Sequence, residues 1–354
     1  MNLSQKLAEI GVERQLDLNR LVGSYQNDLL TTLIELADDI EAKIGARDLT
    51  GFSQSRINGL IGEIKALVTD AYGATFEQVQ GELFELARDE AVFTLNSTNG
   101  LIGVDLLTSL APEPLLRQIV KKDLLQGAPL AEWFKRQEAD TQFRLTTAIR
   151  LGVAQGETNG QIIARLRGLE QTMKRDGSVM AATRRNLEAL VRTGVQTVAN
   201  NSRIGTFEAN ADVIKGLQQI STLDGRTSDI CMACSGKQWT LKTKEPIGHG
   251  IPWNTGTPRH WNCRSTIISV LKSFKELGLP FDEFPESTRA SMDGQVAQGF
   301  TFDDFLKKKG KAFQDDMLGV GRAELWRDGK ITLSQLLDQQ GNPLSLAQLR
   351  KKYE

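Results

Sequence analysis

Apolar residues recur at intervals of three and four over the first two hundred positions, the spacing that puts side chains on one face of a helix. The first stripe comprises Val22, Tyr25, Leu29, Leu33, Leu36, Ile40 and Ile44. The second comprises Ile57, Leu60, Ile61, Ile64, Leu67 and Val68, continued after Gly73 by Phe76, Val79, Leu83 and Leu86. The third comprises Leu187, Leu190, Val191, Val195, Val198 and Ala199. These stripes predict successive amphipathic helices between about residues 14 and 205, packed into a helical core; a coiled-coil or partner-binding surface is the alternative.

Turn signals divide this helical stretch. The Pro112-x-Pro114 pair, which follows several glycines, indicates a boundary near residues 100 to 115. Ser178 is suited to cap the helix that carries the third stripe and ends near residue 210. The remaining helices are expected at about 115–125, 130–151 and 161–169, with a turn at 156–160.

The pattern changes after residue 210. Residues 213–220 and the β-branched run at 265–270 predict two strands that pair antiparallel. Between them the Pro- and Gly-rich stretch from about 236 to 258 leaves little room for helix or sheet. The residues after 275 predict short helices broken by Gly and Pro. They end in an amphipathic tail, about 328–349, expected to dock on the body of the protein or on a neighbour.

Length and composition are those of an ordinary globular protein with two or three domains. Of the 354 residues, 40% are hydrophobic and 25% are charged, and the formal net charge is -1, which argues against a generally cationic nucleic-acid binder. No apolar run approaches the roughly 20 residues that cross a bilayer, and the N-terminus lacks an apolar signal core. We therefore expect synthesis in a cytoplasm, where thiols stay reduced.

All three cysteines and one of the two histidines fall into two pairs. Cys231-x-x-Cys234 is followed, after 25 intervening residues, by His260-x-x-Cys263. Ligands two residues apart can grip a metal ion from a tight turn, and a second pair completes the tetrahedral shell of Zn²⁺. The sequence therefore predicts a structural zinc held by Cys231, Cys234, His260 and Cys263. The irregular loop between the two pairs buries too little apolar surface to fold without help, so the metal is expected to hold it in one conformation.

Other roles for these residues stay open. His249, in a flexible Gly-His-Gly loop, is the rival fourth ligand, but His260 is favoured because it is paired with Cys263. Buried thiols without metal are one alternative, and a redox pair at Cys231 and Cys234 is another. Three cysteines cannot all form intramolecular disulfides, and the strand-then-helix context of a redox pair is not predicted around them.

A catalytic zinc is not expected. Catalytic sites usually keep one coordination position for water, whereas four protein ligands close the shell. The His-x-Glu that base deaminases place before Pro-Cys-x-x-Cys is absent, and so is the metalloprotease pattern HExxH. We therefore predict no enzymatic activity and no catalytic residues.

The zinc pairs and their flanks resemble the phage Mu protein F-like head morphogenesis family of minor capsid proteins. The segments that carry the resemblance are Thr222-Leu223-Asp224-Gly225-Arg226-Thr227, Cys231-x-x-Cys234-Ser235-Gly236-Lys237 and Pro258-Arg259-His260-x-x-Cys263-Arg264. It covers about residues 130 to 275 and includes the helix that leads into the strand. One departure is Ser265, where many relatives place a further cysteine.

The resemblance implies a low-copy part of the virion rather than an enzyme. It implies association with the portal protein and the major capsid protein, several copies per virion, a role in head morphogenesis or genome packaging and delivery, and location in the phage head after synthesis in the host cytoplasm. Packaged DNA is a further partner to consider. The predicted segments are an N-terminal helical region at 1–110, the Mu F-like domain at 111–275 with its zinc-binding loop at 213–270, and a C-terminal helical tail at 276–354.

The predicted fold is therefore mainly α with a small α+β zinc-stabilised domain. Long N-terminal helices precede a short antiparallel sheet around the Cys3His site, and short C-terminal helices follow. Arg226, Arg259 and Arg264 flank that site, and we expect them to hold the loop by hydrogen bonds to carbonyls and Asp224, an acidic partner being the alternative.

Two other functions compete with the head-protein hypothesis. A DNA-binding zinc protein is suggested by the zinc-ligand pairs and the basic run Lys307-Lys308-Lys309-Gly310-Lys311. The helical pair around the 156–160 turn could also be a helix-turn-helix, with Arg165, Arg167, Lys174 and Arg175 close by. Such runs and pairs are more often a solvated surface and a packing unit. A nuclease of the HNH class would want a second CxxC and another histidine, which this chain lacks.

Overall fold

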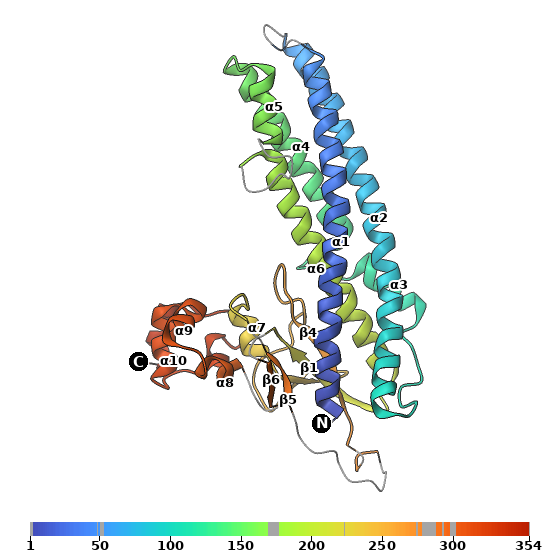
Figure 1. Ribbon diagram of the computed structural model, residues 1–354, viewed down its shortest axis with the longest axis vertical. Coiled ribbons are helices and arrows are strands. Elements are labelled where there is room, and N and C mark those ends of the chain that lie inside the picture. The colour runs from blue at the N-terminus through green and yellow to red at the C-terminus, as the bar shows by residue number, and fades with distance from the viewer. Residues whose placement is uncertain are drawn as a thin grey trace. The chain divides into compact units, whose positions relative to one another are not determined.

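The structure is a computed structural model that describes residues 3–47, 49, 53–168, 177–222, 224–273, 275–277, 288–291, 294–297 and 302–353. Its elements confirm a mainly helical chain with a small antiparallel sheet (Figure 1). The chain forms two compact units: the helical unit, residues 19–85 with 120–195, and the sheet unit, residues 1–18 with 86–119 and 196–354. The predicted segment boundaries at 110 and 275 stay a prediction.

The predicted helices are present. They are α1 (Leu3–Gly45), α2 (Gln54–Ile102), α3 (Glu113–Lys122), α4 (Leu130–Ala154), α5 (Asn159–Arg167) and α6 (Val179–Ala209). Nearly all the stripe residues are buried, which confirms the interpretation as a packed core. Ser178 Oγ accepts a hydrogen bond from the backbone N–H of Ala181, as expected of the cap of α6. Among the described helices, none is both long and apolar enough to span a bilayer.

The start of α1 differs from the expectation. The helix begins at Leu3 rather than near residue 14, because Leu7 and Ala8 pack against Ile220 and Ile268 of the sheet. Val12 packs against the same cluster, but Leu7, Ala8 and Val12 do not form a regular apolar stripe, so this part of the helix shows no clear period in the sequence. Tertiary packing, not local pattern, extends this helix.

A buried hydroxyl chain ties three helices of the helical unit together. Tyr72 Oη lies 2.8 Å from Thr141 Oγ1, and Thr141 Oγ1 lies 3.2 Å from Thr183 Oγ1, linking α2, α4 and α6. Burial raises the pKa of the Tyr72 phenol, so this group stays neutral and continues to donate. At Gly152 in α4, a Cβ would lie 2.6 Å from the side chain of Ile162, so glycine allows α5 to pack closely.

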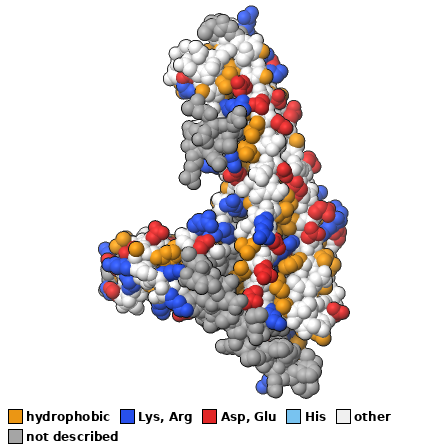
Figure 2. All heavy atoms as spheres, in the orientation of Figure 1, with side chains coloured by type: hydrophobic (Ala, Val, Ile, Leu, Met, Phe, Trp, Pro, Cys, Tyr) orange, Lys and Arg blue, Asp and Glu red, His pale blue; other side chains and the backbone are white. Residues whose placement is uncertain are grey.

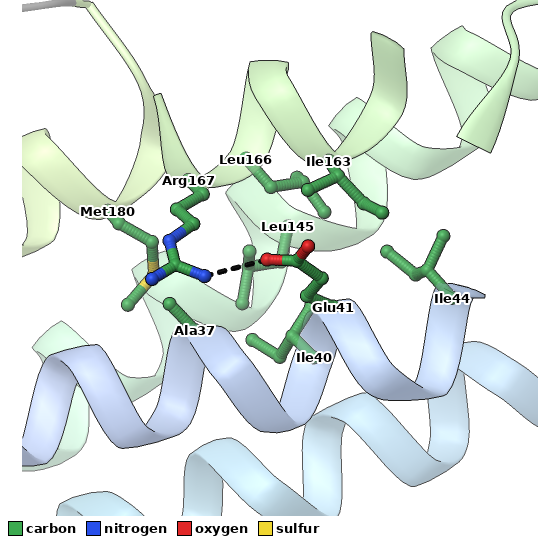
Figure 3. Close-up of a pocket in the computed structure, with 9 residues that line it drawn as sticks. All are labelled: Ala37, Ile40, Glu41, Ile44, Leu145, Ile163, Leu166, Arg167 and Met180. Carbon is green, nitrogen blue, oxygen red and sulfur yellow. Dashed lines mark hydrogen bonds and ion pairs between the residues drawn. The ribbon is translucent and has the colours of Figure 1, made fainter. Parts of the chain in front are cut away.

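Arg167 closes a small apolar pocket of about 230 Å³ in the helical unit (Figure 3). Ile40 and Ile44 line it, and the Arg167 guanidinium forms ion pairs with Asp38 and Glu41 at 2.6 and 2.7 Å. Arg165, likewise, is paired with Glu157. Because both arginines are engaged in ion pairs, they offer little support to the helix-turn-helix interpretation; Lys174 and Arg175 lie outside the described residues.

The sheet of the sheet unit has the order β3-β2-β1-β4, antiparallel throughout. Its strands are β1 (Ile214–Ile220), β2 (Gln238–Thr240), β3 (Pro246–Ile247) and β4 (Thr266–Leu271). The pairing of β1 with β4 was predicted. The expectation of little sheet between the ligand pairs was wrong for β2 and β3, which are too short to show an alternating pattern. Gly216 makes room for β2, since a Cβ there would lie 2.5 Å from the Trp239 carbonyl oxygen.

The C-terminal helices were predicted and pack around one core. They are α8 (Phe302–Lys307), α9 (Lys311–Leu318), α10 (Val320–Arg327), the 3₁₀ helix η1 (Leu333–Leu336) and α11 (Leu346–Tyr353). A hairpin of β5 (Thr288–Ser291) and β6 (Gly294–Ala297) precedes them and was not expected. Met232, from the helix α7 (Asp229–Cys234), is part of this core together with Phe305 and Leu336. The C-terminal tail therefore docks on the body of the same chain.

Candidate metal centre

The first cysteine pair lies on α7, a helix of six residues. Ser228 is its N-cap and accepts a hydrogen bond from the backbone N–H of Cys231, while Asp229 adds a favourable negative charge in the first turn. A helix this short shows no apolar period, so the sequence indicated only a tight turn. No helix was predicted after the strand, and this counted against a redox pair. Since α7 does follow β1, that objection is weaker than expected.

The second pair lies in a turn just before β4. The backbone N–H of Cys263 donates to the His260 carbonyl, and Asn262 takes a positive φ of 60° within that turn. The turn brings the His260 and Cys263 side chains to the same side, facing α7. Two segments distant in sequence thus meet at one point, as predicted.

Three of the four predicted ligands form a compact group. Cys231 Sγ lies 3.3 Å from His260 Nε2 and 3.6 Å from Cys263 Sγ, and the three ligand atoms all lie within 4.8 Å of one another. A tetrahedral zinc with ordinary bond lengths separates two sulfurs by about 3.8 Å, and a sulfur from a nitrogen by about 3.6 Å. The two separations from Cys231 are slightly shorter than these and the third is at most 4.8 Å, so a small adjustment would bring the three atoms to the spacing of such an ion.

Cys234 lies outside this group. It is fully buried and packs with Trp239, Ile251 and Leu337. Burial raises the pKa of its thiol, and the nearby charge of Cys263 adds to the effect, whereas Arg259 acts in the opposite direction. The four-ligand set stays a prediction.

His249, the rival ligand, is engaged in the fold. Its Nε2 lies 2.8 Å from the Gln238 carbonyl oxygen, and its Nδ1 accepts from the backbone N–H of Ile251. The ring stands edge-on to Trp239, with centroids 5.0 Å apart, and burial lowers its pKa. Both ring nitrogens are therefore already used, which favours His260 over His249 as a ligand.

The protonation of the group suits a cation. The hydrogen bond from Cys231 holds the pKa of Cys263 well below its usual range, and the same contact raises the pKa of Cys231. The Cys263 thiolate also raises the pKa of His260. A thiolate and an imidazole are the forms that bind a metal, so metal binding would release the protons that the group carries.

The surroundings of His260 are those of a ligating imidazole. Its Nδ1 lies 2.8 Å from the Trp261 carbonyl oxygen, so Nδ1–H donates there, while Nε2 faces Cys231 Sγ. Metal-bound histidines commonly donate their second ring nitrogen in this way. Ser228 Oγ, 2.8 Å from Nε2, is a neighbour that the sequence did not indicate. A hollow of about 220 Å³ beside Cys231 and His260 supplies an entry path for an ion.

Two of the three flanking arginines hold the loop internally, as expected. Arg264 donates to both carboxylate oxygens of Asp224, at 2.6 and 2.7 Å, tying the residue after Cys263 to the turn before α7. Arg259 donates to Gln219 and to the Trp253 carbonyl oxygen. Arg226 differs in degree, because 83% of its side chain is exposed, although its guanidinium lies 3.9 Å from the Asp224 carboxylate.

The Arg264–Asp224 pair predicts a specific pH dependence. Arg264 lowers the pKa of Asp224 from 3.8 to about 2, so the pair stabilises the folded state fully above about pH 4 and loses its effect as the pH falls to about 2. After discounting for partial exposure, Asp224→Asn should lower the free energy of unfolding by about 1 kcal/mol at pH 7. Urea unfolding of both proteins should show this gap closing between pH 4 and pH 2. A gap that is the same at pH 2 as at pH 7 would contradict the prediction.

Fold and site together define a class: a helical protein with a small antiparallel sheet and a cysteine–histidine group that could hold a metal ion. The model of the family described as "Phage Mu protein F like protein" matches residues 144–268, which run from α4 to β4 and include the whole group. This confirms the resemblance: the matched segment belongs to the phage Mu protein F-like family. The family suggests a phage head morphogenesis protein, and such families are typically structural rather than enzymatic. Searches of curated proteins and of solved structures found no match.

Proposed function

We propose that this chain is a minor head protein of a bacteriophage, bound near the portal and acting in head morphogenesis or in packaging and delivery of the genome. The observation that carries the proposal is the family match over 144–268. The portal protein and the major capsid protein are its proposed partners, with several copies per virion. In this role the chain is made in the host cytoplasm, ends in the virion, and acts as a structural part without catalytic residues.

The cysteine–histidine group is, in this proposal, a structural Zn²⁺ site. Cys231, His260 and Cys263 would hold the ion, and Cys234 would complete the shell from the next turn of α7. Zinc would supply a fixed link between α7 and the turn before β4. That link would keep the Arg264–Asp224 pair and the exposed Arg226 in place for docking.

Co-sedimentation tests the head-protein proposal. The tagged chain is expressed in bacteria with the portal and coat genes that neighbour its own gene, and lysates are separated on a density gradient. The chain should move with procapsid-sized particles when both partners are present and stay at the top when it is expressed alone. Finding it free in both cases would count decisively against the proposal.

The alternative, a DNA-binding zinc protein, gains little from the structure. Lys307 is paired with Asp303, and the Lys309 ammonium lies over the Phe305 and Phe313 rings. On the face drawn in Figure 2, acidic and basic side chains alternate along the long helices. DNA binding would require affinity that falls steeply with salt, because each phosphate contact releases counterions; a flat response in a salt titration rules it out.

A further inference from the structure

A buried charge cluster lies in the sheet unit, apart from the metal centre. The Glu90 side chain is fully buried in α2 and accepts hydrogen bonds from Arg14 Nε of α1 and Arg203 Nε of α6. Arg203 is only 4% exposed and also donates to Thr266 of β4. Two guanidinium groups thus share one carboxylate, which leaves one positive charge in excess.

A hollow of about 320 Å³ opens beside this cluster, between α1, α2, α6 and β4. Arg203 is the one charged residue among the described residues that line it. Apolar walls come from Leu7, Ile10 and Phe93, and polar ones from Ser269 and the threonines of α2. The hollow therefore combines a cationic group with apolar surface.

Two lining residues carry buried polar atoms without partners. Arg203 Nη2 and Ser269 Oγ have no hydrogen-bond partner among the described residues. Such atoms are rare in folded proteins, because a buried donor without an acceptor is costly. Water could accept these hydrogen bonds, but it would leave the excess charge unbalanced.

We propose that this hollow binds a monocarboxylate with a short apolar chain. The carboxylate takes hydrogen bonds from Arg203 Nη2 and Ser269 Oγ, and the apolar chain lies against Leu7, Ile10 and Phe93. One negative charge balances the cluster, whereas a phosphate dianion would exceed it and find apolar walls. The ligand is either a free small carboxylate or the C-terminal residue of a partner chain, which presents the same two groups.

Calorimetric titration of the full chain with butyrate tests the proposal, at constant ionic strength. Butyramide has the same shape without the charge, so it should bind at least tenfold more weakly. Ser269→Ala removes a hydroxyl with no partner, so the free protein should unfold at the same temperature as the wild type. The variant should nevertheless bind butyrate about fivefold more weakly, since one hydrogen bond is lost.

Two further ligands test whether the bound carboxylate comes from a small molecule or a chain terminus, and whether the hollow prefers a carboxylate to a phosphate. A short peptide ending in leucine with a free carboxylate, compared with its amide, separates a chain terminus from a small molecule; tighter binding than butyrate indicates the terminus. Inorganic phosphate binding more tightly than both would overturn the proposal. So would equal binding of butyrate and butyramide, unchanged binding by Ser269→Ala, or no binding of either carboxylate.

Discussion

Replacing Cys263 with serine should abolish stoichiometric zinc binding and release the loop around the site. Structural zinc modules bind their ion with an apparent free energy on the order of 10–16 kcal/mol, and the hydrogen bond from Cys231 lowers the pKa of Cys263, which favours the thiolate form that binds metal. Metal analysis of the purified variant should find well under one zinc per chain. Limited proteolysis should then cut within residues 225–265, while α2 and α4 stay intact. A variant that keeps one zinc per chain would show that the ligands have been misassigned.

Two matched variants separate the ligands from their neighbours. His249→Gln should retain zinc, because both nitrogens of that ring are engaged in hydrogen bonds within the fold. Cys234→Ser decides between the four-ligand site and one made by the compact group of three. Loss of zinc, with the Cys263→Ser phenotype, would support Cys234 as the fourth ligand. Full retention would assign the fourth position to another donor, with Ser228 Oγ and water as the nearest candidates.

A large loss of folding stability is expected when Glu90 is replaced. Glu90→Gln removes the carboxylate that Arg14 and Arg203 share, so Arg203 is left buried with its charge uncompensated. Breaking a buried ion pair in this way typically costs about 3–5 kcal/mol, a large part of a domain's total stability of about 5–15 kcal/mol. Urea unfolding monitored by circular dichroism would measure the loss.

Glu113→Gln is the matched control for that experiment. Glu113 pairs with Arg88 and Arg117, but both members of each pair are substantially exposed, so water replaces the lost partner. Its effect on the unfolding midpoint should be small beside that of Glu90→Gln. Equal effects of the two substitutions would mean that the Glu90 cluster is not the structural centre that its burial indicates.

The sequence predicted those elements whose side chains repeat often enough to show a period. The stripes of α1, α2 and α6 each extend over several turns, and their residues are buried as expected. Helix α7 has six residues and β2 has three, so neither shows a period, and both depend on caps and tertiary contacts. Glu90 illustrates another limit, because a glutamate in a helix is normally assigned to the surface and only its distant partners explain its burial.

The candidate site was predictable in position but not in detail. The ligand types and their spacing predicted that Cys231, His260 and Cys263 lie close together, and their ligand atoms lie within 4.8 Å of one another. The roles of Ser228 and the Trp261 carbonyl could not be predicted, because they arise from the cap of α7 and from a backbone turn. The arginine contacts were predictable in part. Arg264 and Asp224 were expected to meet, but the exposure of Arg226 depends on how the turn is folded.

The packing of Met232 has a consequence for biosynthesis. Met232 stands between the two cysteines of α7 and shares its core with Leu349, which leaves the ribosome much later. During translation Cys231, His260 and Cys263 emerge first, whereas the core that covers Met232 is built from residues 302 to 349, which are made later. A product truncated before residue 302 would lack this core, so cellular quality control could recognise it by the apolar surface exposed around Met232.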